Sequence, residues 1–143
     1  MVNNDLFHTV QQLARQLTKH LNQALEPFGL YSAQWSVLYV LKTQGTLTQK
    51  QLCDYLAVEA PPMTRNIQRL IKQGYVEQVT GPDRRAKYIR LTQKAYVEYP
   101  KWEQTVAKMN HMLLEHFPQS SQEQLYLLTL EWLSTLREQS KKE

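Results

Sequence analysis

The chain has 143 residues, of which 42% are hydrophobic, and 17 Lys and Arg against 13 Asp and Glu give it a formal net charge of +4. These values suit a single globular domain with its own core, over residues 1–143, and no apolar run approaches the roughly 20 residues of a membrane span. The start of the chain lacks the charged and apolar segments of a signal peptide, so we expect a cytoplasmic protein. Its one cysteine, Cys53, excludes an internal disulfide and a cysteine-rich zinc site.

Two helices are predicted in the first third of the chain. Apolar residues recur every three or four positions from Asp5 to Pro27, which indicates one long amphipathic helix that ends at Pro27 and Gly29. Ser32 is predicted to cap a second helix, which stops near Gly45. Its large apolar residues are Trp35, Leu38, Tyr39 and Leu41.

Two shorter helices follow, joined by a brief connection. Thr48 is a good N-cap for a helix over residues 48–56, whose apolar face holds Leu52, Cys53 and Leu56. Paired prolines fit the first turn of a helix because their missing N–H groups would have no partner there, so the next helix begins near Ala60. Gly74 ends that helix, where a residue at positive φ is cheapest.

The helix that begins at Ala60 is predicted to have an apolar face and a polar one. The apolar positions are Met63, Ile67, Leu70 and Ile71. The remaining circumference carries hydrogen-bonding and charged side chains, namely Thr64, Arg65, Asn66, Gln68, Arg69, Lys72 and Gln73.

A β-hairpin is predicted directly after this helix. Residues 75–79 form a strand, the chain turns at Gly81, Pro82 and Asp83, and residues 87–91 return as a second strand with Ile89 and Leu91 facing inward. The order helix, turn, helix, hairpin is that of a winged helix-turn-helix. The expected fold class is therefore mainly α with a small β-hairpin wing.

Two further apolar stripes follow the hairpin. The first is Trp102, Val106, Met109, Leu113 and Phe117, and the second is Leu125, Leu128, Trp132 and Leu136. Pro100 either kinks a helix that begins at Thr92 or starts a new one. Together with the N-terminal helix these stripes exceed what a small winged unit covers, which predicts a C2 homodimer. A monomer whose helices fold back on their own core is the alternative.

Several residues of these elements together resemble the pattern of the MarR family of bacterial transcription regulators. The residues that fit its recognition helix, wing and following helix are Val58, Pro61, Thr64, Arg65, Arg69, Leu70, Gly74, Val76, Asp83, Arg85, Leu91 and Thr92. The sequence departs from the family pattern at Glu59, Pro62 and Ala95. The resemblance implies a DNA-binding part over residues 30–95, flanked by dimerisation helices at 1–29 and 96–143, and it implies repression as the usual mode.

The distribution of charge also points to DNA as the partner. Residues 48–95 hold nine Lys and Arg against four Asp and Glu, whereas the rest of the chain holds eight against nine. Clustered cations are the main source of affinity for phosphates. Because a helix fits the major groove, the side chains of the Ala60 helix that we expect to contact DNA are Thr64, Arg65, Asn66 and Arg69. Arg65 on guanine and Asn66 on adenine are the expected base readers.

The wing residues take their roles from the resemblance. It implies that Arg85 enters the minor groove and that Asp83 braces it, while Arg84, Lys87 and Arg90 hold phosphates. An ordinary exposed turn pair is the alternative for Asp83 and Arg85. Two half-sites about 34–36 Å apart would make the DNA site a pseudo-palindrome.

Four aromatic residues form a candidate effector pocket by the same resemblance, namely Tyr31, Trp35, Tyr39 and Trp102. Core packing is the alternative explanation for them. Cys53 is either a redox sensor or, as its apolar face indicates, an inert thiol. The four histidines offer no i,i+4 pair, so no metal site is expected, and no cofactor motif is present.

Two rival functions are weighed against DNA binding. An enzyme is disfavoured because the chain has no glycine-rich phosphate loop and no nucleophile with an evident base. A winged-helix module that binds proteins would carry large apolar residues on the outer face of the Ala60 helix, where Thr64, Arg65, Asn66 and Arg69 stand instead.

Overall fold

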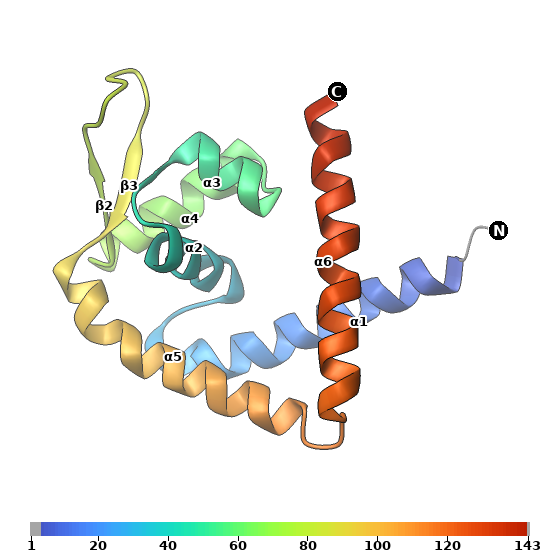
Figure 1. Ribbon diagram of the computed structural model, residues 1–143. Coiled ribbons are helices and arrows are strands. Elements are labelled where there is room, and N and C mark those ends of the chain that lie inside the picture. Colours follow the sequence, from blue (N-terminus) through green and yellow to red (C-terminus); the bar gives the residue numbers. More distant parts are fainter. Residues whose placement is uncertain (1–3, 143) are drawn as a thin grey trace. The chain divides into compact units, whose positions relative to one another are not determined.

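The computed structural model describes residues 4–142. They fall into two compact units that part between Met109 and Asn110. The elements are α1 (Asn4–Leu25), the 3-10 helix η1 (Glu26–Phe28), α2 (Ser32–Gln44), β1 (Leu47–Thr48), α3 (Gln49–Leu56), α4 (Ala60–Lys72), β2 (Val76–Val79), β3 (Tyr88–Leu91), α5 (Gln93–Leu113) and α6 (Gln119–Lys142). Figure 1 shows α2 inside the first unit, with α3 and α4 on one side of it and α5 on the other.

The start of α2 differs from the sequence prediction. Tyr31, in an extended conformation, is the N-cap, and Ser32 is the first helical residue. The N–H of Ser32 donates to Asn22 Oδ1 at 2.7 Å, and the N–H of Tyr31 donates to Gln34 Oε1 at 2.9 Å. A side chain from α1 and one from the first turn of α2 therefore satisfy the N–H groups of the first helical residue and of the N-cap.

The caps predicted for the two short helices are confirmed. Thr48 Oγ1 accepts from the N–H of Gln51 at 3.1 Å, and Gln51 Oε1 accepts from the N–H of Thr48 at 2.8 Å, which is a reciprocal capping box. Helix α4 begins at Ala60 with both prolines in its first turn. Gly74 follows it with φ at +83°, a conformation that costs glycine little.

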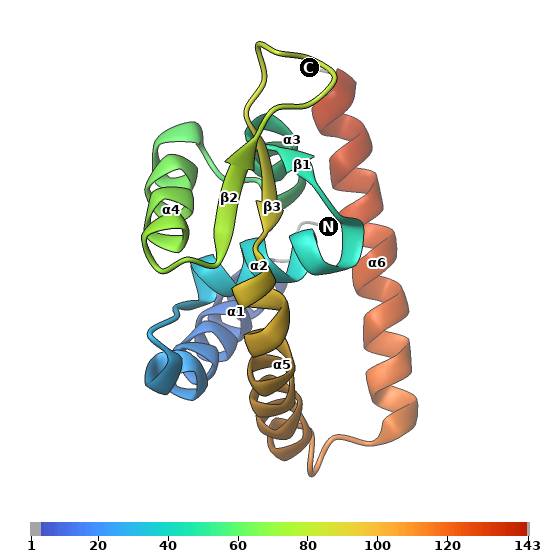
Figure 2. The same ribbon diagram turned by 90° about the vertical axis from the view of Figure 1, so that its left-hand side faces the viewer.

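The hairpin is confirmed and extended by one strand. β2 and β3 pair antiparallel, and β1 adds to the outer edge of β3, giving the order β1-β3-β2. Figure 2 shows α4 beside β2, with β1 on the far side of β3. Sequence analysis missed β1 because two residues are too short for an alternating pattern.

The core of the first unit lies between α2, α4, the sheet and α5. Ile89 and Leu91 are buried as predicted, and so are Met63, Ile67 and Leu70. Ile71, however, is 41% exposed, so the apolar face of α4 is narrower than predicted. The largest buried side chains are Trp102 and Tyr99 of α5, and the ring of Tyr99 stacks on Trp35 with centroids 5.4 Å apart.

Helix α5 resolves the alternative left open at Pro100, because it runs unbroken from Gln93 to Leu113 through that residue. Thr92 caps it, since its Oγ1 accepts from the N–H of Ala95 at 3.2 Å. The missing N–H of Pro100 leaves the carbonyl of Tyr96 without its helical partner, and both residues are exposed.

The second unit contains α6 and the last residues of α5. Exposed apolar side chains run along α6, namely Leu125, Tyr126, Leu127, Leu128, Leu130, Leu133 and Leu136. Among the described residues, no helix is long and apolar enough to cross a membrane.

Candidate nucleic-acid interface

The polar face of α4 is held by its neighbours. Thr64 Oγ1 accepts from Gln49 Nε2 at 2.7 Å, and Asn66 Oδ1 accepts from Gln34 Nε2 at 2.9 Å. The guanidinium of Arg69 lies 4.8 Å from the centroid of the Tyr31 ring, a cation–π contact. These three expected DNA contacts therefore lie on one helix in fixed positions.

Arg65, the fourth expected contact on α4, is exposed. It lines a shallow surface cavity along the outer side of the helix, whose other walls are Gln34, Asn66, Gln68, Arg69, Lys72 and Gln73. The lining is polar or basic throughout, which suits a surface that meets phosphates and base edges rather than apolar side chains.

The C-terminal end of α4 is tied to the rest of the first unit. Gln73 Nε2 donates to the carbonyl of Gly29 at 2.8 Å, and Lys94 Nζ donates to the carbonyl of Gln73 at 2.7 Å. The hydroxyl of Thr92 donates to the carbonyl of Gly74 at 2.6 Å. These contacts satisfy carbonyls at the helix end and fix the angle at which the hairpin leaves it.

Asp83 organises the tip of the wing. Its Oδ1 accepts from the N–H of Arg85 at 3.0 Å and lies 3.3 Å from Arg85 Nε, and its own N–H donates to the hydroxyl of Tyr88 at 3.2 Å. A Cβ on Gly81 would stand 2.5 Å from the Tyr88 ring, so the turn requires glycine there. The Arg85 side chain is nevertheless 93% exposed, and Arg84 and Lys87 are exposed beside it.

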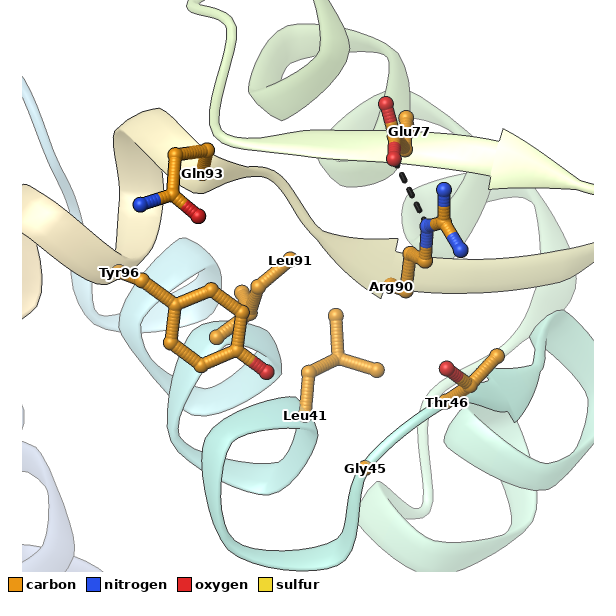
Figure 3. Close-up of a pocket in the computed structure, with 8 residues that line it drawn as sticks. All are labelled: Leu41, Gly45, Thr46, Glu77, Arg90, Leu91, Gln93 and Tyr96. Carbon is orange, nitrogen blue, oxygen red and sulfur yellow. Dashed lines mark hydrogen bonds and ion pairs between the residues drawn. The ribbon is translucent and has the colours of Figure 1, made fainter.

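Arg90 forms a shorter ion pair than Arg85 does. Its Nε lies 2.7 Å from Glu77 Oε1, and the two residues face each other in the β2–β3 register. Figure 3 shows this ion pair among the residues that line an open cavity. The cavity has a volume of about 420 Å³, and sequence analysis did not predict it. Tyr96 and Leu41 form part of its wall.

The four candidate effector residues separate into two kinds. Trp35 is 8% exposed and Trp102 is fully buried, and both rings contact Tyr99. Burial, with a smaller contribution from the charge of Glu103, raises the pKa of Tyr99 to about 12. Tyr31 and Tyr39 are about half exposed at the surface.

Cys53 packs against the core and is half-buried. Burial raises the pKa of its thiol, and the charges of Asp54 and Glu59 add to that effect. A raised pKa keeps the group protonated at neutral pH, which opposes oxidation. Within residues 4–142, no three His, Cys, Asp or Glu side chains gather in a way that could hold a metal ion.

Sequence analysis missed the residues that position these contacts. Gln34 and Gln49 come from α2 and from the start of α3, and their side chains reach α4 from 32 and 15 positions away in sequence. A weak signal existed for Gln34, because a glutamine three residues after an N-cap is half of a capping box. No local signal connects Gln49 with Thr64 or Glu77 with Arg90.

Comparison with known proteins identifies the class. The family model described as MarR family matches residues 28–86. The chain is 45% identical, over 122 residues, to the uncharacterized HTH-type transcriptional regulator YwoH of Bacillus subtilis (strain 168), an alignment that covers 85% of this chain and 89% of that protein.

Solved structures share the fold over almost the whole chain. The transcriptional regulator PA4135 matches with a TM-score of 0.84 at 26% identity, covering 94% of this chain and 98% of that one. A mutant MarR from E. coli complexed with operator DNA matches with a TM-score of 0.82 at 23% identity, covering 91% and 94%.

The chain belongs to the MarR family, as the winged helix-turn-helix and the matched residues indicate. It is accordingly a transcription regulator and not an enzyme.

Proposed function

We propose that this regulator binds double-stranded DNA in a sequence-specific manner, as a homodimer on a pseudo-palindromic operator, and that it represses transcription by covering promoter DNA. The observation that carries the proposal is the polar face of α4, where neighbouring side chains hold Thr64, Asn66 and Arg69 in place beside exposed Arg65. A protein of the same fold has been solved with operator DNA.

In this proposal α4 lies in the major groove. Arg65 reads a base edge, since a guanidinium can donate two hydrogen bonds to guanine, and each such pair is worth about 1–3 kcal/mol of discrimination. Thr64 and Arg69 contact DNA beside it. Asn66 is the second base reader.

The wing contacts the adjacent minor groove. We assign insertion to Arg85, and Asp83 positions it through the two contacts from one carboxylate oxygen. Arg84 and Lys87 bind phosphates. Arg90 contributes less, because Glu77 already neutralises much of its charge.

Exposed apolar side chains support the homodimer. Val10, Leu13 and Leu17 of α1 are exposed, and α6 carries a longer series of leucines. Surfaces of this kind mark protein interfaces when they are contiguous. Light scattering at micromolar concentration should give twice the chain mass of 16.9 kDa, and a monomer would remove the dimer from the proposal.

The proposal includes release of DNA by a small aromatic effector. Of the four residues expected to line its pocket, Tyr31 and Tyr39 are accessible, and the Tyr31 ring already contacts Arg69 of α4. A planar aromatic acid that displaced the ring from Arg69 would couple its own binding to DNA release. Titration of the DNA complex with benzoate and with phenol checks this, and unchanged DNA affinity with both would remove the effector.

The experiment that tests the proposed function is fluorescence anisotropy on duplex DNA from upstream of the protein's own gene and on a shuffled duplex, at about 50 to 200 mM salt. We expect tight, salt-dependent binding with a strong preference for the upstream DNA. If the two duplexes bind equally weakly, the search extends to a selection from random sequence. If no DNA binds at low salt, the protein-interaction module becomes the better explanation.

A further inference from the structure

One buried polar side chain connects α2 to the DNA-facing side of α4. Among the buried residues of the part of the chain that the structure describes, Gln34 alone is polar, and it is 4% exposed. Burying an amide is costly unless its groups are hydrogen-bonded. Both branches of the Gln34 amide are used, since Oε1 accepts from the N–H of Tyr31 and Nε2 donates to Asn66 Oδ1, each at 2.9 Å.

The hydrogen bond from the N–H of Tyr31 determines which atom donates and which accepts in the next bond. A backbone N–H can only donate, so the Gln34 atom that faces Tyr31 must be the oxygen. The other branch of the Gln34 amide is then NH₂, which can only donate, so the Asn66 atom that faces it must also be oxygen. The NH₂ group of the Asn66 amide, Nδ2, consequently lies on the branch that points away from Gln34.

That NH₂ group is available to a ligand. Asn66 is partly exposed and lines the polar cavity along α4, next to Arg65 and Arg69. Within residues 4–142 the hydrogen bond to Gln34 is its only side-chain hydrogen bond. Adenine recognition by an asparagine needs both amide branches turned to the base edge, whereas here the oxygen is directed to α2.

We infer that Gln34 is a specificity-determining positioning residue, which orients the Asn66 amide so that Asn66 donates to an acceptor on a base edge in the major groove. Guanine is the best match because its O6 and N7 are both acceptors, and cytosine, which offers a donor, is the poorest. This inference rests on the proposed DNA binding, and it replaces adenine with guanine as the base expected opposite Asn66.

The test is selection from a randomised duplex library, followed by anisotropy on the selected site. In Gln34→Glu, one carboxylate oxygen still accepts from the Tyr31 N–H, but the other now faces Asn66. The Asn66 amide must then turn to donate to it, which presents Oδ1 to the DNA. We expect the preference at one position of each half-site to move from guanine to adenine or cytosine, by about tenfold. Asn66→Ala should erase the preference at that same position.

Gln51→Glu is the matched control. Gln51 also caps a helix through its side-chain oxygen, accepting from the N–H of Thr48, and the substitution adds the same charge. We expect its base preferences to equal those of the wild type. Thermal melts of all variants report folding. Should Gln34→Glu fail to fold, Gln34→Met, of similar volume without polar groups, frees Asn66 and should give equal preference for guanine and adenine there.

Three outcomes overturn the inference. If Gln34→Glu keeps the guanine preference that Asn66→Ala abolishes, Gln34 does not orient the reader. If neither variant changes any base preference while the wild type selects a sequence, Asn66 reads no base, although the proposed function stands. If the wild type enriches no sequence, the proposed function fails together with the inference.

Discussion

The outer face of α4 and the tip of the wing both carry cations, but they are built differently. On α4, side chains from α2, α3 and the residue before α2 hold Asn66, Thr64 and Arg69. At the wing tip, the Arg85 side chain contacts, within residues 4–142, only the carboxylate two residues away, and it is 93% exposed. Groups that are already held lose less entropy on binding, so α4 suits base discrimination, while the wing suits affinity through charge.

Removal of the wing cations should have the largest effect. Arg84→Ala, Arg85→Ala and Lys87→Ala together take three contacts from each protomer and six from the proposed dimer, so the slope of log affinity against log salt should fall by about 4–5. Affinity should drop on the order of a hundredfold or more for operator and shuffled duplexes alike. Anisotropy over a salt series measures both quantities.

The control for the wing variant removes the same charge elsewhere. Lys108→Ala, Lys141→Ala and Lys142→Ala delete three lysines outside residues 48–95. We expect this variant to bind nearly as the wild type does. An equal loss in the control would show that net charge, and not the wing, governs affinity.

Arg65→Ala should have the next largest effect and act on discrimination. It should weaken operator binding by about 1–3 kcal/mol and relax preference at one position of each half-site. Lys87→Ala, the comparison variant, should weaken all duplexes alike and lower the salt slope by about one per protomer, which is about two for the dimer. Competition with single-base variants of the operator separates the two, and operator binding undiminished by Arg65→Ala would exclude this residue as a base reader.

The contrast between helix and wing also marks how far sequence reasoning reached. The elements were predictable because their signals are local: Thr48 with Gln51 makes a capping box, and Gly74 ends α4 at positive φ. The apolar periodicity placed Ile89 and Leu91 inward, as observed. The family resemblance pointed to the polar face of α4 and to the wing.

What sequence reasoning missed lies in contacts between distant residues. Helical periodicity showed Asn66 on an outer face, but not that Gln34 takes its oxygen, because that contact spans 32 positions. Alternation showed Arg90 pointing outward, but its pairing with Glu77 depends on the register set by the hairpin. The predicted N-cap of α2 was wrong by one residue, since a side chain of α1 satisfies the N–H of Ser32.

Asp83→Asn sharpens the comparison at the wing. An asparagine oxygen can still accept from the N–H of Arg85, so the turn should persist, but the attraction to the guanidinium is lost. An exposed pair of this kind is worth under about 1 kcal/mol, so the melting temperature should hardly change. Affinity for operator and shuffled DNA should fall by the same few-fold factor, because an Arg85 side chain that Asp83 no longer positions loses more entropy when it enters the minor groove.

Affinities of Asp83→Asn that equal or exceed those of the wild type would contradict the bracing role. Glu138→Gln is the matched control, since it removes one acidic charge outside residues 48–95. We expect its affinities for both duplexes to match those of the wild type.

Glu77→Gln should have the smallest effect and tests whether an internal ion pair limits the wing. The substitution releases Arg90, whose Nε lies 2.7 Å from the carboxylate, and it removes one negative charge. If the freed guanidinium of each protomer reaches a phosphate, the salt slope should rise by about two for the dimer, and affinity for operator and shuffled DNA should rise by the same few-fold factor. An unchanged slope would show that Arg90 lies out of reach of the backbone. A rise confined to the operator would show instead that the hairpin strands take part in base discrimination, which would remove the distinction drawn between the helix and the wing.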